Sequence, residues 1–537
     1  MRCLWLFLAG SCAALAAGTT PAAPPDGTAL IDRHLATTWQ KANVKPAAPA
    51  DDAEFLRRVY LDVAGRIPGA TEARQFLDDK RPDKRNRLVE QLLSSPHYAN
   101  HFTNVWRALL LPEVATSIQA RIQLPAFRSW LRKHLDQNTA YDALVRELIT
   151  APMGTAGMGK GFGLGDDTPS PDEFFLAKDL MPENLAAAVS RVFLGVKLEC
   201  AQCHDHPFAT WKRDQFWSFA AFFAGVKRQG QGDVVIASRE DPAKREIAIP
   251  NTSRMARARF LDGKEPAWKD GGNTREILGE WITKPDNPYF ARAAVNRMWA
   301  YFFGTGLIDP VDEIAGGDHP ATCPELLDAL AKAFVESKFD LKFLVRAITS
   351  SRAYQLTSHG GAGGQEDVKL FARMAVRGLT AEQLFDSVAK AVGFRDNNAN
   401  APPGVVFAGG PGNGREEFLA RFATTGDKPT EKQTSILQAL TLMNSKLVAD
   451  ATSVDRSETL AGVVDAPFLD SAGKVEVLYL AALARRPTAA EADRVTKFVG
   501  EHTHTAKDDA ERKKLYAEAL ADVFWTLLNS GEFVLNH

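Results

Sequence analysis

Apolar residues recur at three- and four-residue steps along most of the chain, which is the spacing of amphipathic helices. In the first half, this pattern predicts helices over residues 31–42, 52–64, 71–79, 84–94, 97–111, 124–136, 141–150, 182–196 and 211–225. In the second half, it resumes at Thr274 and predicts helices over residues 288–303, 324–337, 341–350, 381–392, 434–450, 474–483, 489–502 and 508–528. We therefore predict a mainly α fold.

Residues 227–270 interrupt the helical pattern. Within them, residues 233–238 and 245–249 look like short strands separated by turns. We expect a small β insertion here, between a helical domain over residues 28–226 and a second helical domain over residues 274–537. Glycine- and proline-rich loops are expected over residues 154–167, 360–364 and 401–414.

The first residues have the form of a secretion signal. Arg2 supplies a positive charge, residues 3–16 are an apolar run too short for a comfortable membrane span, and residues 14–16 form a small-x-small cleavage site. We expect a cleaved signal peptide over residues 1–16, a secreted or periplasmic protein, and no transmembrane segment. Cys12 ends a run that resembles a lipoprotein box, but the spacing is one residue off, so cleavage is favoured over a lipid anchor.

Charge and cysteine content narrow the classes of function. The net charge is −2, so no overall field recruits nucleic acid. Two of the five cysteines leave with the signal, and only Cys200, Cys203 and Cys323 remain. Three cysteines in a chain of this length do not make a disulfide scaffold.

The run Cys200-Ala-Gln-Cys203-His204 has the spacing of a c-type haem attachment site. In such a site the two thiols add to the haem vinyl groups, and the adjacent histidine is an axial ligand of the iron. Secretion fits this interpretation, because c-type haem is attached outside the cytoplasm. We predict one haem c bound by Cys200, Cys203 and His204.

A structural zinc ion is the main alternative at the same place. Its ligands would be Cys200, Cys203, His204 and His206, with His319 or Cys323 able to complete the set. A disulfide between Cys200 and Cys203, or two free thiols, is the third interpretation.

A haem would also raise the question of a second axial ligand. His206 is too close in sequence to reach the opposite haem face, so that ligand would be a distant residue such as His101, Met298 or His319, or would be absent. A second ligand suits electron transfer, and an open position suits small-molecule binding or redox catalysis. The aromatic helix over residues 211–225 could wall a haem crevice, but we favour ordinary core.

Several short runs are familiar together. They are residues 58–68 (RVYLDVAGRIP), 92–98 (LLSSPHY), 200–208 (CAQCHDHPF), 211–216 (WKRDQF), 287–292 (NPYFAR), 295–299 (VNRMW), 303–310 (FGTGLIDP), 351–356 (SRAYQL), 379–384 (LTAEQL) and 437–444 (LQALTLMN). They resemble a secreted two-domain family of unknown function from planctomycetes and Verrucomicrobia. In that family, a cytochrome-like domain precedes a planctomycete-specific partner domain.

The resemblance runs in family order from about Leu30 to His537. It assigns residues 28–226 to the cytochrome-like domain and residues 274–537 to the partner domain. It implies a cytochrome-like protein that uses its haem for electron transfer or a redox reaction, with a redox protein as transient partner. The alternative is a non-redox secreted binding or assembly module with zinc or a disulfide at the cysteines. Whether the chain is an enzyme stays open.

Overall fold

The computed structural model describes residues 26–115, 118–153, 169–231, 234–268, 272–316, 319–359, 368–393, 415, 418–419 and 452–537. The expected signal segment 1–16 with Cys12, the loops expected over residues 154–167, 360–364 and 401–414, and the helix expected over residues 434–450 lie outside the described residues.

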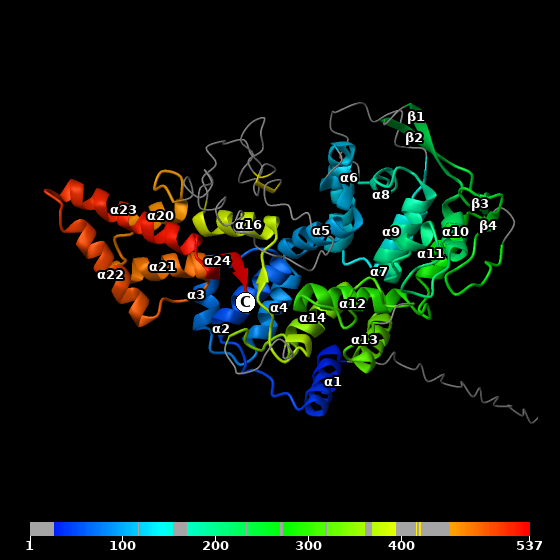
Figure 1. Cartoon of the computed structure of the whole chain (residues 1–537). Coiled ribbons are helices and arrows are strands. Elements are labelled where there is room, and N and C mark those ends of the chain that lie inside the picture. The colour runs from blue at the N-terminus through cyan, green and yellow to red at the C-terminus, as the bar shows by residue number, and fades with distance from the viewer. Residues whose placement is uncertain are drawn as a thin grey trace, which may run out of the picture.

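The fold is mainly α, as predicted (Figure 1). The first half contains α1 (Gly27–Ala42), α2 (Asp52–Val59), α3 (Ala70–Asp78), α4 (Lys84–Leu93), α5 (Pro96–Leu110), α6 (Ile118–Asp136), α7 (Tyr141–Thr150), α8 (Glu173–Leu176), α9 (Pro182–Leu194) and α10 (Arg213–Ala220). The second half contains α11 (Thr274–Ile282), α12 (Phe290–Phe303), α13 (Pro324–Glu336), α14 (Leu341–Ser350), α16 (Ala381–Val392), α20 (Glu458–Asp465), α21 (Ser471–Leu483), α22 (Ala489–Thr503), α23 (Asp509–Leu528) and α24 (Gly531–Val534). No helix among the described residues combines the length and apolar character needed to cross a bilayer.

Side-chain caps fix several helix starts. The Asp26 carboxylate accepts from the backbone N–H groups of Thr28 and Ala29, so α1 begins four residues before the apolar pattern. The helix predicted over residues 52–64 is present, but its second half is not α-helical. There the chain forms a π-helical turn, η1 (Tyr60–Ala64), which ends at Gly65 with φ 71°. The turn widens the helix by one residue and turns Asp62 into the core.

The strands form three two-stranded antiparallel sheets among the described residues. β1 (Val226–Gln231) pairs with β2 (Val234–Glu240), and β3 (Glu246–Ala248) pairs with β4 (Met255–Arg257). These hairpins confirm the small β insertion. The third sheet pairs β5 (Arg377–Gly378) with β6 (Leu535–Asn536), which brings the end of the chain to its middle.

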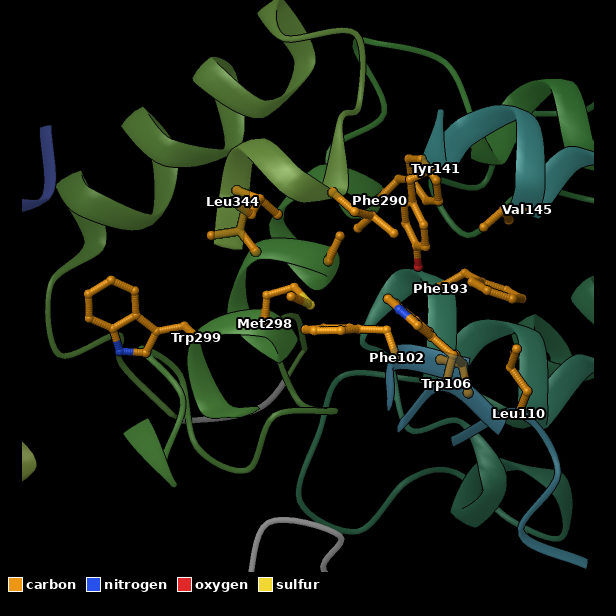
Figure 2. Packing of buried hydrophobic residues seen from close by; sticks show 14 of the residues in the cluster. Phe102, Trp106, Leu110, Tyr141, Val145, Phe193, Phe290, Met298, Trp299 and Leu344 are labelled. Atoms are coloured by element: carbon orange, nitrogen blue, oxygen red, sulfur yellow. The ribbon is translucent and has the colours of Figure 1, made fainter. Parts of the chain in front are cut away.

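Two apolar clusters hold the helices together. The larger extends in sequence from Ile31 to Ala484 and packs side chains from α5, α7, α9, α12 and α14 against one another (Figure 2). The smaller joins Leu61 and Ile67 to α16 and α20–α24. Helices α20–α23 lie at one end of the molecule in Figure 1, while α9, α10 and the β3–β4 hairpin lie at the other. The larger core therefore draws on the first and second halves of the chain alike.

A buried polar cluster, which we name the Asp62 junction, lies between these ends. Its members are Asp62, Tyr354, Arg377 and Asn536. The Asp62 carboxylate accepts from Tyr354 Oη (2.8 Å), from Arg377 Nη2 (2.8 and 3.0 Å) and from Asn536 Nδ2 (2.8 Å). The side chain is 1% exposed, so its charge is matched inside the core rather than by water.

Two buried arginines of α2 extend the junction toward the end of the chain. Arg57 Nη2 donates to the Phe533 carbonyl (2.6 Å), and Arg58 Nε donates to the His537 carbonyl (3.1 Å). Arg58 also pairs with Glu54 at 2.5 Å. The last residues are thereby held against the second helix, where Figure 1 marks the C-terminal end.

Candidate functional site

The cysteine motif lies on an exposed loop between α9 and α10, which we name the cysteine loop (residues 197–210). The helix predicted over residues 182–196 ends two residues early, at Leu194. Gly195 adopts φ +62° and ends α9, and Val196 then forms an isolated β-bridge with Glu313. A short 3-10 turn, η3 (Glu199–Gln202), carries Cys200, and Cys203 follows it.

The loop is held on its inner side and open on its outer side. Ala201 is fully buried in the larger core, whereas Cys200, Cys203 and His204 are exposed. The indole N–H of Trp217 donates to the Gln202 carbonyl at 3.0 Å, and Arg213 Nε donates to the same oxygen at 3.4 Å. Anchoring of the residues between the cysteines therefore turns both thiols outward.

The charged groups of the loop are ordered by the first turn of α10. Asp205 Oδ1 accepts from the Arg213 backbone N–H at 3.0 Å, and Asp205 Oδ2 lies 3.1 Å from Lys212 Nζ. The Arg213 N–H bond, together with Lys212, lowers the pKa of Asp205. Burial raises the pKa of Glu199, which precedes Cys200. The carboxylate of Asp205 thus stays charged and fixes the chain just after His204.

The two histidines of the motif have opposite hydrogen-bond roles. His204 Nδ1 lies 2.7 Å from the Asp205 carbonyl, which only accepts, so Nδ1 carries the proton. In neutral His204 the lone pair is then on Nε2, and the side chain is exposed. His206 Nδ1 instead accepts the Phe208 N–H at 3.2 Å, so neutral His206 carries its proton on Nε2. A ligating histidine commonly donates the N–H of its other ring nitrogen to a carbonyl. Of the two histidines of the motif, only His204 has that arrangement.

The remaining candidate ligands are engaged elsewhere. Cys323 is buried at the start of α13, where its sulfur accepts from Thr38 of α1 at 3.3 Å. His319 pairs with Glu313 at 2.9 Å. Among the residues that the structure describes, no group of three or more His, Cys, Asp or Glu side chains is arranged to hold a metal ion. The zinc set of Cys200, Cys203, His204 and His206 is therefore not gathered into a cage here.

Two of the suggested second axial ligands are core residues. His101 Nε2 lies 2.5 Å from Tyr301 Oη, and Met298 is a buried member of the larger core (Figure 2). The aromatic residues of the 211–225 segment are buried in that core too, which confirms the core interpretation. They include Trp211, Phe216, Trp217, Phe219, Phe222 and Phe223.

Sequence reasoning missed two features of the cysteine loop and its surroundings. One is the segment of residues 313–316, which we name the strap and which contacts both ends of the cysteine loop. The other is Phe208, a large apolar side chain that is 86% exposed only four residues after His204. The glycine pair at residues 316–317 was the available signal for the strap, since consecutive glycines mark tight backbone approach.

Comparison with known proteins identifies two matching families. Residues 30–228 match the family described as PSCyt2, Protein of unknown function (DUF1549). Residues 274–409 match the family described as PSD1, Protein of unknown function (DUF1553). No curated protein and no solved structure gives a significant match to the chain. The chain thus carries, in this order, a segment similar to each of two protein families of unknown function.

Proposed function

We propose that the protein is a secreted, cytochrome-like protein that carries one covalent c-type haem at Cys200 and Cys203, with His204 as axial ligand, for electron transfer or redox chemistry. The observation that carries this proposal is the hydrogen bond from His204 Nδ1 to the Asp205 carbonyl, which leaves Nε2 free in an exposed position. Signal-like residues 1–16 support export, which c-type attachment requires.

The two thiols fit covalent attachment. Both are free and exposed, and both leave a loop whose inner side is anchored. Each thiol would add across one vinyl double bond, with sulfur bonded to one carbon and the thiol hydrogen to the other, so the addition needs no oxidant. A bound haem supplies a one-electron couple at its iron. The chain's own part is to hold the thiols outward, to engage the Nδ1–H of His204 with the Asp205 carbonyl and to exclude water from the inner side of the loop.

The first test is expression of the mature chain in a periplasm with working c-type haem maturation. We expect a Soret band and a mass increase of one haem, both lost in Cys200→Ala/Cys203→Ala. Cys323→Ala is the matched control, because Cys323 is buried away from the loop and its loss leaves haem attachment intact. A colourless wild-type protein of bare mass would contradict the proposal. Bound zinc in that protein would favour the non-redox module, and a mass two hydrogens lower would favour a disulfide.

The histidines give a sharper second test. His204→Gln should keep the covalent mass but change the visible spectrum, because the axial nitrogen is lost. His206→Gln should leave the spectrum unchanged, because His206 Nδ1 is already used by the Phe208 N–H. Equal spectral changes in both variants would show that the hydrogen-bond roles of the two rings do not decide ligation.

A further inference from the structure

The strap is hydrogen-bonded to the residues just before the cysteine loop. The Ile314 N–H donates to the Gly195 carbonyl at 3.0 Å, and Glu313 bridges Val196. A Cβ on Gly195 would lie 2.8 Å from Ile314 Cγ1, so the Ile314 side chain packs against Gly195 more closely than any larger residue would permit.

The strap also closes the far end of the loop. The Thr210 N–H donates to the Gly316 carbonyl at 3.0 Å, and Trp211 Nε1 donates to the Ala315 carbonyl at 3.2 Å. Four consecutive residues therefore bind the chain on both sides of the cysteine motif. The strap lies within the segment that matches the second family, whereas the loop lies within the first.

Gly316 is the position that this arrangement can least change. It adopts φ +84°, and a Cβ there would lie 2.3 Å from Trp211 Nε1 and 2.8 Å from Trp211 Cε2. The Trp211 side chain is 7% exposed and packs in the larger core, so it has little room to move aside.

We propose that the strap is the positioning element of the cysteine loop, with Gly316 as its critical residue, so that the second family segment sets the geometry of a site whose reactive groups all come from the first. The part of this proposal that concerns haem rests on the proposed function. In that part, Gly316 influences how His204 ligates the iron. Gly316 touches neither thiol nor haem in this proposal and acts through the backbone of residues 210–211.

The chain provides a matched control in Gly263. Its φ is +82°, nearly that of Gly316, but a Cβ there would meet nothing within 4 Å. Gly316→Ala and Gly263→Ala therefore carry the same backbone penalty, and only the first collides with Trp211. Trp211→Phe is a second variant. It removes the hydrogen bond from Nε1 to the strap and leaves Gly316 unsubstituted.

The first measurement uses the full mature chain produced without haem and follows amide hydrogen exchange over residues 204–212. We expect exchange at least about tenfold faster in Gly316→Ala than in wild type, a smaller increase in Trp211→Phe, and no change in Gly263→Ala. If Gly316→Ala does not fold, Trp211→Phe decides by the same measurement. Wild-type exchange in the folded strap variants, or equal acceleration in Gly263→Ala, would overturn the proposal.

The second measurement uses haem-loaded protein and records the visible spectrum and midpoint potential. Gly316→Ala should retain the covalent haem mass but shift both readouts, and Gly263→Ala should shift neither. A purely structural role would lower stability without moving the spectrum, and that outcome would overturn the assignment to ligation. A colourless wild type would contradict the proposed function alone, because the exchange comparison needs no haem.

Discussion

Asp62 and Asp205 each organise a polar cluster, and the two clusters have opposite surroundings. Asp62 is 1% exposed and accepts bonds from Tyr354, Arg377 and Asn536, which come from widely separated parts of the chain. The side chain of Asp205 is 57% exposed and binds only its near neighbours Lys212 and Arg213. Buried polar partners at the junction tie distant segments together, whereas similar bonds at the cysteine loop orient a reactive surface.

The largest expected difference comes from deleting the two carboxylates. Asp62→Ala should lower the free energy of unfolding by about 3–5 kcal/mol, because it leaves buried Arg377 without its counter-charge. Asp205→Ala should lower it by less than about 1 kcal/mol, because water replaces the lost partner. Urea unfolding of both variants measures the difference, and similar losses would erase the contrast between the clusters.

The inner side of the cysteine loop should respond like core. Ala201 is fully buried between the two cysteines, so Ala201→Leu should cost about 1–3 kcal/mol through overpacking. Lys197→Leu places the same side chain at an exposed position of the same loop and should change the free energy of unfolding by less than about 0.5 kcal/mol. Thermal unfolding compares the two, and tolerance of leucine at position 201 would mean that the loop is loosely packed.

His537, which follows the junction residue Asn536, should make stability depend on pH. Burial, with the nearby Arg57 charge, lowers the pKa of His537 from 6.5 to about 4. Between these values the unfolded chain binds more protons than the folded one, so stability is full above about pH 6.5 and falls as the pH drops toward 4. We expect a loss of about 2 kcal/mol by pH 5. His537→Gln should make the free energy of unfolding less dependent on pH, and His504→Gln, at an exposed position, should leave that dependence unchanged. Urea unfolding at several pH values measures both.

The smallest expected effect is at the outer side of the loop. Phe208 is 86% exposed, so Phe208→Ser should change the unfolding free energy by less than about 0.5 kcal/mol. Phe102→Ser is the contrast. Because Phe102 is fully buried in the larger core, its loss should lower the free energy of unfolding by several kcal/mol. A marked loss of stability in Phe208→Ser would show that this ring is packed in solution.

Helix positions were readable from the sequence where local chemistry sets them. Apolar spacing placed the starts of the helices capped by Thr380 and Thr488 at the observed residues, but it missed the first turn of α1, which the Asp26 cap adds. The pairing of Arg377 with Asn536 was not readable, because two-residue strands far apart in sequence leave no periodic signal. For the site, the motif located the cysteines and His204. The proton positions on His204 and His206 depend on loop geometry that spacing does not encode.

The bond from Arg57 to the Phe533 carbonyl joins residues 476 positions apart. During synthesis at roughly 5–20 residues per second, α2 leaves the ribosome about half a minute or more before its partner exists. Until then, the Arg57 guanidinium lacks this acceptor, whereas Phe55 of the same helix can already stack on Phe76 of α3. The charge of Arg57 therefore reaches its native buried partner only when almost the whole chain has been made.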